Sequence, residues 1–247
     1  MSERQTKAQR KEEARRQRLA IERHMARSRR TRWIAVGVVV LLVATGATYY
    51  ALRPRPEVQD PQELLAAATK AAQAAGCTDV SDVGPYQPES ADRVHIGVQG
   101  GPATMPPLST YPSVPPASGP HNPIPWSRGV YSAPPPIDQV IHSLEHGAAI
   151  VWYSPDASGD ELAKVEDFYR DTSNGPKVIV APYDYPDQGA AGTLPGGSRM
   201  ALVAWHHVET CSRVSLAAAF GFTARYGVPP FGSQPYLGNA PEPGTPI

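Results

Sequence analysis

The sequence contains only two cysteines, Cys77 and Cys211, and they do not form a C-x-x-C pair. Thiol–disulfide exchange is therefore not expected as an activity of this chain. The sequence also lacks a P-loop, a G-x-G-x-x-G fingerprint after a strand and a G-x-S-x-G nucleophile elbow. These absences remove the motif-based evidence for a nucleotide-binding protein, a dinucleotide-dependent enzyme or an α/β-hydrolase.

The chain also lacks net charge, but its charges are unevenly distributed. Residues 1–32 carry 12 Lys and Arg against four Asp and Glu, a local charge of +8 that the remaining residues balance with −8. Residues 33–52 contain no charged side chain, and 20 helical residues span the roughly 30 Å hydrocarbon layer of a bilayer. This pattern predicts a retained transmembrane helix at 33–52. A cleaved signal peptide is the competing interpretation, although both its basic and its apolar parts are too long for one.

The positive-inside rule places residues 1–32 in the cytoplasm and the chain after residue 52 outside it. Both cysteines then lie in an oxidising compartment, where one disulfide is the simplest pairing and two metal-binding thiolates are the alternative. The basic segment can contact anionic headgroups, but it lacks the interleaved aromatic residues that favour nucleic-acid binding. The sequence thus predicts a single-pass cell-membrane protein with no nucleic-acid partner.

The residues beyond the span predict one α/β or α+β domain with about four strands flanked by helices. A linker and first helix occupy 53–76, the globular domain occupies 77–228, and a proline- and glycine-rich tail covers 229–247. Apolar periodicity and capping signals predict helices at 60–75, 137–146, 160–170 and 213–226. Alternating or continuous apolar runs predict strands at 93–98, 148–153, 177–181 and 200–206.

A proline-rich segment interrupts this pattern. Residues 100–136 include 12 prolines, which removes too many N–H donors for a central strand or helix. Such a long irregular segment is either a functional loop or a disordered one. Its aromatic residues, Tyr111, Trp126 and Tyr131, favour order.

The most informative motif is His142-Ser143-Leu144-Glu145-His146-Gly147. Two histidines at i and i+4 lie on one helical face, so both rings can reach a single metal ion. Solvent-exposed or hydrogen-bonded imidazoles are the alternative. His121 follows a stiff Pro-Ala-Ser-Gly-Pro loop and supplies a third candidate imidazole, and His95 or Met200 can complete the set. A thioether ligand favours copper, whereas a carboxylate favours zinc.

The order H-x-x-E-H is also the inverted zinc-peptidase pattern. A peptidase needs Glu145 as general base and a third ligand, for which Glu209 is the only well-separated downstream carboxylate. Gly147 ends the helix at once, which is unlike the long helix of such enzymes. We therefore expect Glu145 to orient an imidazole or to cap neighbouring backbone, and we assign no catalytic residues.

Several motifs together resemble one bacterial family, known only as domain of unknown function 3105. They are P-P-A-S-G-P-H at 115–121, G-V-Y at 129–131, H-S-L-E-H-G at 142–147, A-I-V-W-Y at 149–153, V-I-V-A-P at 178–182 and A-W at 204–205. The resemblance covers about residues 77–226 and implies one membrane span with an exported domain, but no established activity. It carries over His121, His142, Glu145, His146 and, less directly, His95. The family's A-W is commonly followed by glycine, whereas this chain has His206, which leaves the role of His206 and His207 open.

Three functional hypotheses follow. The first is a membrane-anchored, extracytoplasmic domain that binds copper or zinc for trafficking or sensing. The second is a metal-free domain that interacts with an envelope partner through the proline-rich loop. The third, least supported by the sequence, is a zinc hydrolase.

Overall fold

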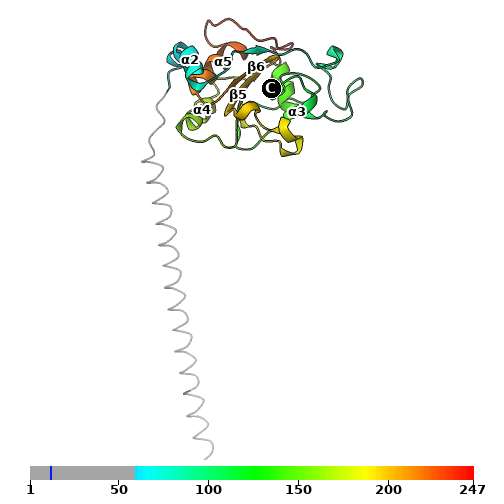
Figure 1. The fold of residues 1–247 in the computed structure, drawn as a ribbon, viewed down its shortest axis with the longest axis horizontal. Coiled ribbons are helices and arrows are strands. Elements are labelled where there is room, and N and C mark those ends of the chain that lie inside the picture. The colour runs from blue at the N-terminus through cyan, green and yellow to red at the C-terminus, as the bar shows by residue number, and fades with distance from the viewer. Residues whose placement is uncertain (1–11, 13–58) are drawn as a thin grey trace, which may run out of the picture. The chain divides into compact units, whose positions relative to one another are not determined.

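The computed structural model describes Glu12 and residues 59–247. The predicted membrane span 33–52, the rest of the basic segment and the start of the linker lie outside the described residues. Within the part of the chain that the structure describes, no helix is long and apolar enough to cross a membrane. That part folds as a mixed α/β domain around one six-stranded sheet (Figure 1).

The sheet has the strand order β1-β6-β5-β3-β4-β2. Its strands are β1 Ser81–Asp82, β2 Gly129–Val130, β3 Ala149–Tyr153, β4 Val178–Pro182, β5 Met200–Ala204 and β6 His207–Cys211. The central strand β3 pairs in parallel with β4 and antiparallel with β5. The parallel pair is connected through α4, which gives the α/β character that the alternation of helices and strands predicts.

The expected strand count was wrong, because the sheet has six strands and not four. The predictions for β3, β4 and β5 are confirmed, but 93–98 is not a strand. It makes a single isolated bridge, between His95 and the loop residue His121, and Gly97 then turns the chain with φ +73°. The two-residue strands β1 and β2 are too short to leave a sequence pattern, and β6 follows β5 after a single tight turn.

Four α-helices surround the sheet. They are α2 Pro61–Ala75, α3 Ile137–Glu145, α4 Asp160–Arg170 and α5 Leu216–Tyr226, with short 3₁₀ helices at Glu89–Ala91, Leu108–Thr110, Pro186–Gly192 and Pro195–Gly197. The predicted cap of α2 is confirmed, since the Asp60 side chain accepts from the Gln62 N–H and Gly76 ends the helix at φ +65°. Helix α5 starts later than predicted, after the Ser215 cap.

Two different layers cover the two faces of the sheet, because side chains alternate along each strand. Ala149, Val151, Met200 and Leu202 point to one face, which packs against α2, α4 and α5 and is called the helical face. Ile150, Trp152, Ala201 and Val203 point to the other, which packs against α3 and the proline-rich segment and is called the loop face. In Figure 1, α3 lies across β5 and β6 from the other three helices.

The proline-rich segment is ordered on the loop face, as its aromatic residues predict. The Tyr111 ring is buried there, and its hydroxyl donates to the carbonyl of Pro120. On the helical face, Cys77 and Cys211 form the predicted disulfide. This bond joins the end of α2 to β6 and so ties the first helix of the helical face to the sheet.

Candidate metal centre

Helix α3 presents two different sides. Val140, Ile141 and Leu144 are buried against the sheet, as the apolar spacing predicts. His142 and His146 lie one turn apart on a neighbouring side, and their ring centroids are 4.4 Å apart. Gly147, at φ +85°, ends the helix directly after them.

The S-G-P-H loop brings a third imidazole to this side of α3. His121 is fully buried, and its backbone is held between two residues of the 93–98 segment: its N–H donates to the Val94 carbonyl, and its own carbonyl accepts from Ile96. The same pairing places His95 next to His121, with ring centroids 5.0 Å apart. The segment 93–98, which was predicted to be a strand, thus positions His95 through its pairing with His121.

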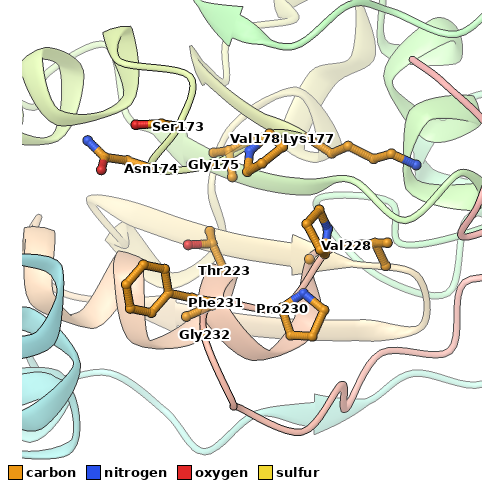
Figure 2. A pocket seen from close by; sticks show the side chains of 14 residues that line it. Ser173, Asn174, Gly175, Lys177, Val178, Thr223, Val228, Pro230, Phe231 and Gly232 are labelled. Carbon is orange, nitrogen blue, oxygen red and sulfur yellow. The ribbon is translucent and has the colours of Figure 1, made fainter.

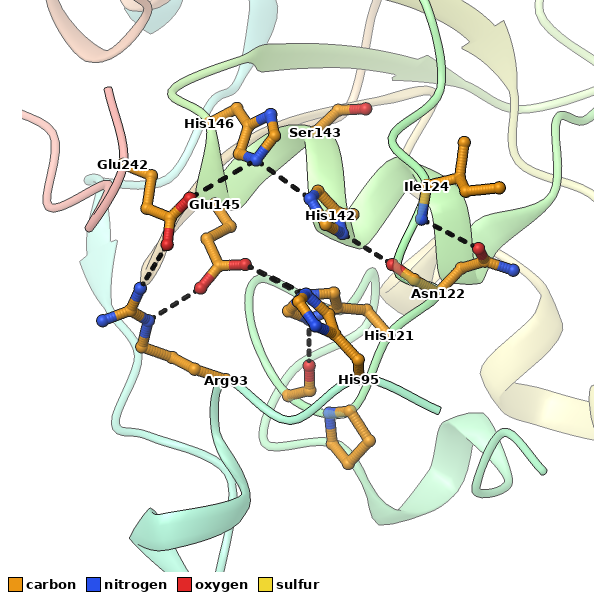
Figure 3. A network of polar contacts seen from close by, with 12 residues as sticks. Arg93, His95, His121, Asn122, Ile124, His142, Ser143, Glu145, His146 and Glu242 are labelled. Atoms are coloured by element: carbon orange, nitrogen blue, oxygen red, sulfur yellow. Dashed lines mark hydrogen bonds and ion pairs between the residues drawn. The ribbon is translucent and has the colours of Figure 1, made fainter. Parts of the chain in front are cut away.

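Four predicted site residues converge. One ligand atom from each of His95, His121, His142 and Glu145 lies within 4.8 Å of every other. His146 joins them, because its Nε2 is 2.9 Å from the Nε2 of His142. We call these five residues the His–Glu cluster, and Figure 3 shows them facing a common centre.

Backbone carbonyls fix the orientation of three of these rings. A carbonyl only accepts, so the ring nitrogen that faces it must carry the proton. In each case that nitrogen is Nδ1: His121 donates to Gly119 at 2.7 Å, His142 to Asn122 at 2.6 Å and His146 to Pro246 at 2.8 Å. The Nε2 atoms of the three rings are therefore the ones directed into the cluster.

The close approach of two Nε2 atoms has a chemical requirement. In their neutral forms, His142 and His146 both present a lone pair at this position, and two lone pairs repel at 2.9 Å. A shared proton or a metal ion removes the repulsion. Two nitrogens bound tetrahedrally to one zinc ion at 2.0–2.1 Å lie roughly 3.3 Å apart, so the two rings need only a small adjustment.

Burial keeps the imidazoles in the form that binds metal. Desolvation lowers the pKa of His142 to about 4, although the Asn122 carbonyl acts in the opposite direction. Desolvation also lowers the pKa of His95, assisted by the neighbouring charge of His121. A neutral imidazole is the species that coordinates a metal, so these two rings are available as ligands at neutral pH.

Glu145 is a carboxylate with both oxygens engaged. Its Oε1 accepts from Arg93 Nε at 2.7 Å, and its Oε2 lies 3.0 Å from His121 Nε2. Burial raises its pKa, but the hydrogen bonds from His121 and Arg93 outweigh burial and bring the pKa down to about 2. Such a weak base does not meet the requirement of a general base that works near neutral pH. Its contact with His121 leaves Glu145 beside an imidazole and paired with Arg93.

Two other candidates are not in the cluster. Met200 was expected as a possible ligand, but its side chain is buried on the helical face, because β5 alternates and only its odd-numbered residues face α3. Glu209, the possible third ligand of a peptidase, lies instead beside the disulfide with Cys77 and Cys211. The disulfide also removes both thiolates as ligands.

His206 has a structural position outside the cluster. It adopts φ +61°, the left-handed region that glycine occupies easily, which explains the glycine at this place in the family resemblance. Its Nε2 is 2.8 Å from Asp92 Oδ2, and the other Asp92 oxygen accepts from Ser118 in the S-G-P-H loop. His206 therefore holds the loop that carries His121. His207 lies on β6 and packs against Tyr226.

Sequence reasoning missed two charged residues of the site. These residues are Arg93 and Glu242, and Arg93 forms ion pairs with both Glu145 and Glu242. Glu242 lies in the proline- and glycine-rich tail, where no helix or strand pattern marks its position. The carboxylate of Glu242 is also 3.6 Å from His146 Nε2. Only the charge of these side chains was visible in the sequence, and their meeting depends on contacts between distant segments.

A separate cavity of about 200 Å³ lies between the segment 173–178 and the end of α5 (Figure 2). Lys177 is the only charged residue among those that line it, and its side chain extends away from the other lining residues. The cavity contains no histidine or carboxylate. It therefore does not compete with the His–Glu cluster as the centre of metal chemistry.

Comparison with known proteins gives one result. A family model described as "Protein of unknown function (DUF3105)" matches residues 107–240. The match includes His121, His142, Glu145 and His146, and it excludes Arg93, His95 and Glu242. No curated protein and no solved structure matches the chain.

Proposed function

Because the chain belongs to the DUF3105 family of proteins of unknown function, we propose a function from its own geometry: the domain binds a divalent metal ion through the His–Glu cluster. His121, His142 and His146 are the principal ligands, His95 is an additional imidazole, and Glu145 supplies negative charge and orients His121. The proposal makes the protein a metal-binding module and not an enzyme.

One observation carries this proposal. Three rings each donate Nδ1–H to a backbone carbonyl, and their three Nε2 atoms point into one buried cluster. Metal-binding histidines almost always have such a partner on the second nitrogen, because it fixes the tautomer and the direction of the lone pair. The two Nε2 atoms of His142 and His146 face each other at 2.9 Å, and the Nε2 of His121 carries a proton to Glu145 that a bound metal ion would replace.

The donor set favours zinc(II) or copper(II). Imidazole nitrogen and carboxylate oxygen suit both ions, whereas copper(I) prefers thiolate or thioether sulfur. The thiols are in a disulfide and Met200 is on the other face of the sheet, so the described residues offer no sulfur ligand at the cluster.

We also propose that the domain works outside the cytoplasm. The basic segment 1–32 and the uncharged segment 33–52 support this topology, and the disulfide between Cys77 and Cys211 suits an oxidising compartment. The membrane is then a partner through 33–52. A module at this place suits metal trafficking or sensing at the envelope.

Metal analysis of the full chain tests the proposal. Purified protein that is incubated with zinc or copper(II) and desalted retains about one equivalent of metal per chain, and added metal raises its thermal midpoint. His142→Ala with His146→Ala abolishes retention. His207→Ala is the matched control, because this buried histidine lies outside the cluster and its loss leaves the metal content unchanged.

The metal-free envelope domain is the alternative that this experiment separates. It predicts no retained metal in the wild-type protein and the same thermal midpoint with zinc and with chelator. The double alanine variant then loses stability equally in both conditions. That combination of results would falsify the metal-binding proposal.

A further inference from the structure

The segment 242–247 lies against the end of α3, where the ligands are. The backbone N–H of Glu242 donates to the Glu145 carbonyl at 3.0 Å. A Cβ added at Gly147 would come within 3.4 Å of Pro243 Cα and within 2.8 Å of a Val228 methyl carbon. The tail therefore packs on the helix terminus at close range, and Figure 1 marks the chain end beside α3.

A single ammonium group fastens this segment to the sheet. Lys177 precedes β4, and its Nζ donates to three carbonyl oxygens: His146 at 2.7 Å, Pro243 at 2.9 Å and Thr245 at 2.6 Å. An ammonium has three N–H donors, so all of them are used. One of the three acceptors belongs to α3 and two belong to the tail, which makes Lys177 the link between them.

Two groups of the segment 242–247 lie beside the two ring nitrogens of His146. The Pro246 carbonyl accepts from Nδ1 and so fixes the tautomer of the ring. The Glu242 carboxylate approaches the other nitrogen, with Oε2 3.6 Å from Nε2, while its Oε1 accepts from Arg93 at 3.0 Å. Two ligands on one tetrahedral ion lie roughly 3.3 Å apart, so the separation of Glu242 from His146 is close to that of two ligands of the same ion.

The exposed side of the cluster is the side that the tail covers. The His121 side chain is 0% exposed and that of Glu145 3%, whereas Glu242 is 45% and Arg93 50% exposed. The His95 side chain, 37% exposed, also reaches the surface, so His95, Arg93 and Glu242 line the mouth of the site, and Lys177 holds the segment that carries Glu242.

We propose that residues 242–247 form a strap that closes over the metal ion, with Glu242 as a further ligand at the mouth of the site. The strap rests on the proposed metal function and adds its regulation: opening the strap withdraws a carboxylate and releases the ring of His146 from its fixed tautomer. The strap thus sets how fast the ion leaves, while the buried ligands set whether it binds.

Metal release from the zinc-loaded full chain tests this proposal. Transfer of zinc to an excess of a chromogenic chelator is followed by stopped flow. Lys177→Gln and Glu242→Gln each accelerate transfer at least about tenfold, in line with the effect of residues that support metal ligands. Lys70→Gln and Glu63→Gln are matched controls, because both residues are exposed on α2, which packs on the helical face, and their transfer rates equal that of the wild type.

Hydrogen exchange of the full chain gives a second measurement. The amides of Glu242 and Thr245 exchange more slowly in the zinc-loaded protein than in the chelator-treated protein, and Lys177→Gln removes this protection. Wild-type release rates in both variants, with zinc-independent exchange of the tail, overturn the strap and leave metal binding intact. A wild-type chain that retains no zinc overturns both proposals.

Discussion

The two faces of the sheet are stabilised in different ways. The helical face is an apolar layer of three helices with a disulfide at its edge, and most of its residues lie in regular elements. The loop face is covered by one short helix and a proline-rich segment, and charged and polar contacts join its distant parts. The helical face therefore provides a stable apolar frame, and the loop face, which rests on that frame, carries the candidate metal site.

The largest effect on stability is expected from removing the disulfide of the helical face. Cys77→Ser with Cys211→Ser removes a crosslink between residues 134 positions apart. The chain-entropy model gives a loss of about 4 to 5 kcal/mol in the free energy of unfolding, measured by urea denaturation. Zinc content of the folded fraction stays the same, because the cluster is on the other face. A parallel loss of zinc would mean that the two faces do not act separately.

The next largest effect concerns the loop face. Glu145→Gln removes the anion that pairs with Arg93 and buried His121, and we expect the unfolding free energy to fall by about 3 kcal/mol and zinc affinity to fall 10- to 100-fold. Isothermal titration and urea denaturation give both values. Glu166→Gln on α4 is the control for a carboxylate of the helical face, and its zinc affinity should equal that of the wild type.

The two faces should respond to pH with opposite signs. Burial raises the pKa of Glu209 on the helical face to about 7, with help from Asp79. The folded state therefore favours the protonated carboxyl, and this stabilisation is lost as pH rises from about 4.5 through 7. Burial lowers the pKa of His142 on the loop face to about 4, so its contribution is lost as pH falls from about 6.5 through 4.

Glu209→Gln isolates the first of these two contributions. At pH 8 the variant should be more stable than the wild type by about 2 kcal/mol, whereas at pH 4 the two should be nearly equal. Chemical denaturation across this pH range measures the difference. A constant difference at every pH would show that Glu209 does not titrate in this range.

The smallest effect is expected at His206. His206→Gly relieves a left-handed backbone conformation but loses the contact with Asp92, and these changes offset each other to within about 1 kcal/mol. Zinc affinity should change less than about threefold, since Asp92 keeps its bond to Ser118. A large loss of affinity would show that the bond from Ser118 to Asp92 does not hold the S-G-P-H loop without His206.

Local patterns in the sequence predicted much of the frame. Capping at Asp60 and Gly76, apolar spacing in α3 and α4, and the apolar runs of β3 to β5 all report interactions within a few residues. The missed strands depend on partners far away: β1 and β2 have two residues each, and β6 is separated from β5 by a turn at His206 that glycine usually occupies.

In the candidate site, too, the residues close together in the sequence were predictable and the contacts between distant segments were not. Helical spacing predicted that His142, Glu145 and His146 lie together, and the stiff loop predicted His121. The placement of Met200 on the opposite face required the parity of β5, which a run of buried residues does not reveal. Glu242 and Arg93 meet across 149 positions, and no periodicity encodes such a contact.

The carbonyl of Pro246 has a consequence for the order of events during folding. It fixes the ring of His146, which lies 100 positions earlier in the chain, and His95 and His121 come from segments that are earlier still. A chain in which this segment has not yet docked therefore has all four histidines of the cluster, but the ring of His146 lacks the carbonyl that fixes its tautomer. In the proposed site, slow release of the ion is therefore acquired late in folding, when two segments 100 positions apart meet.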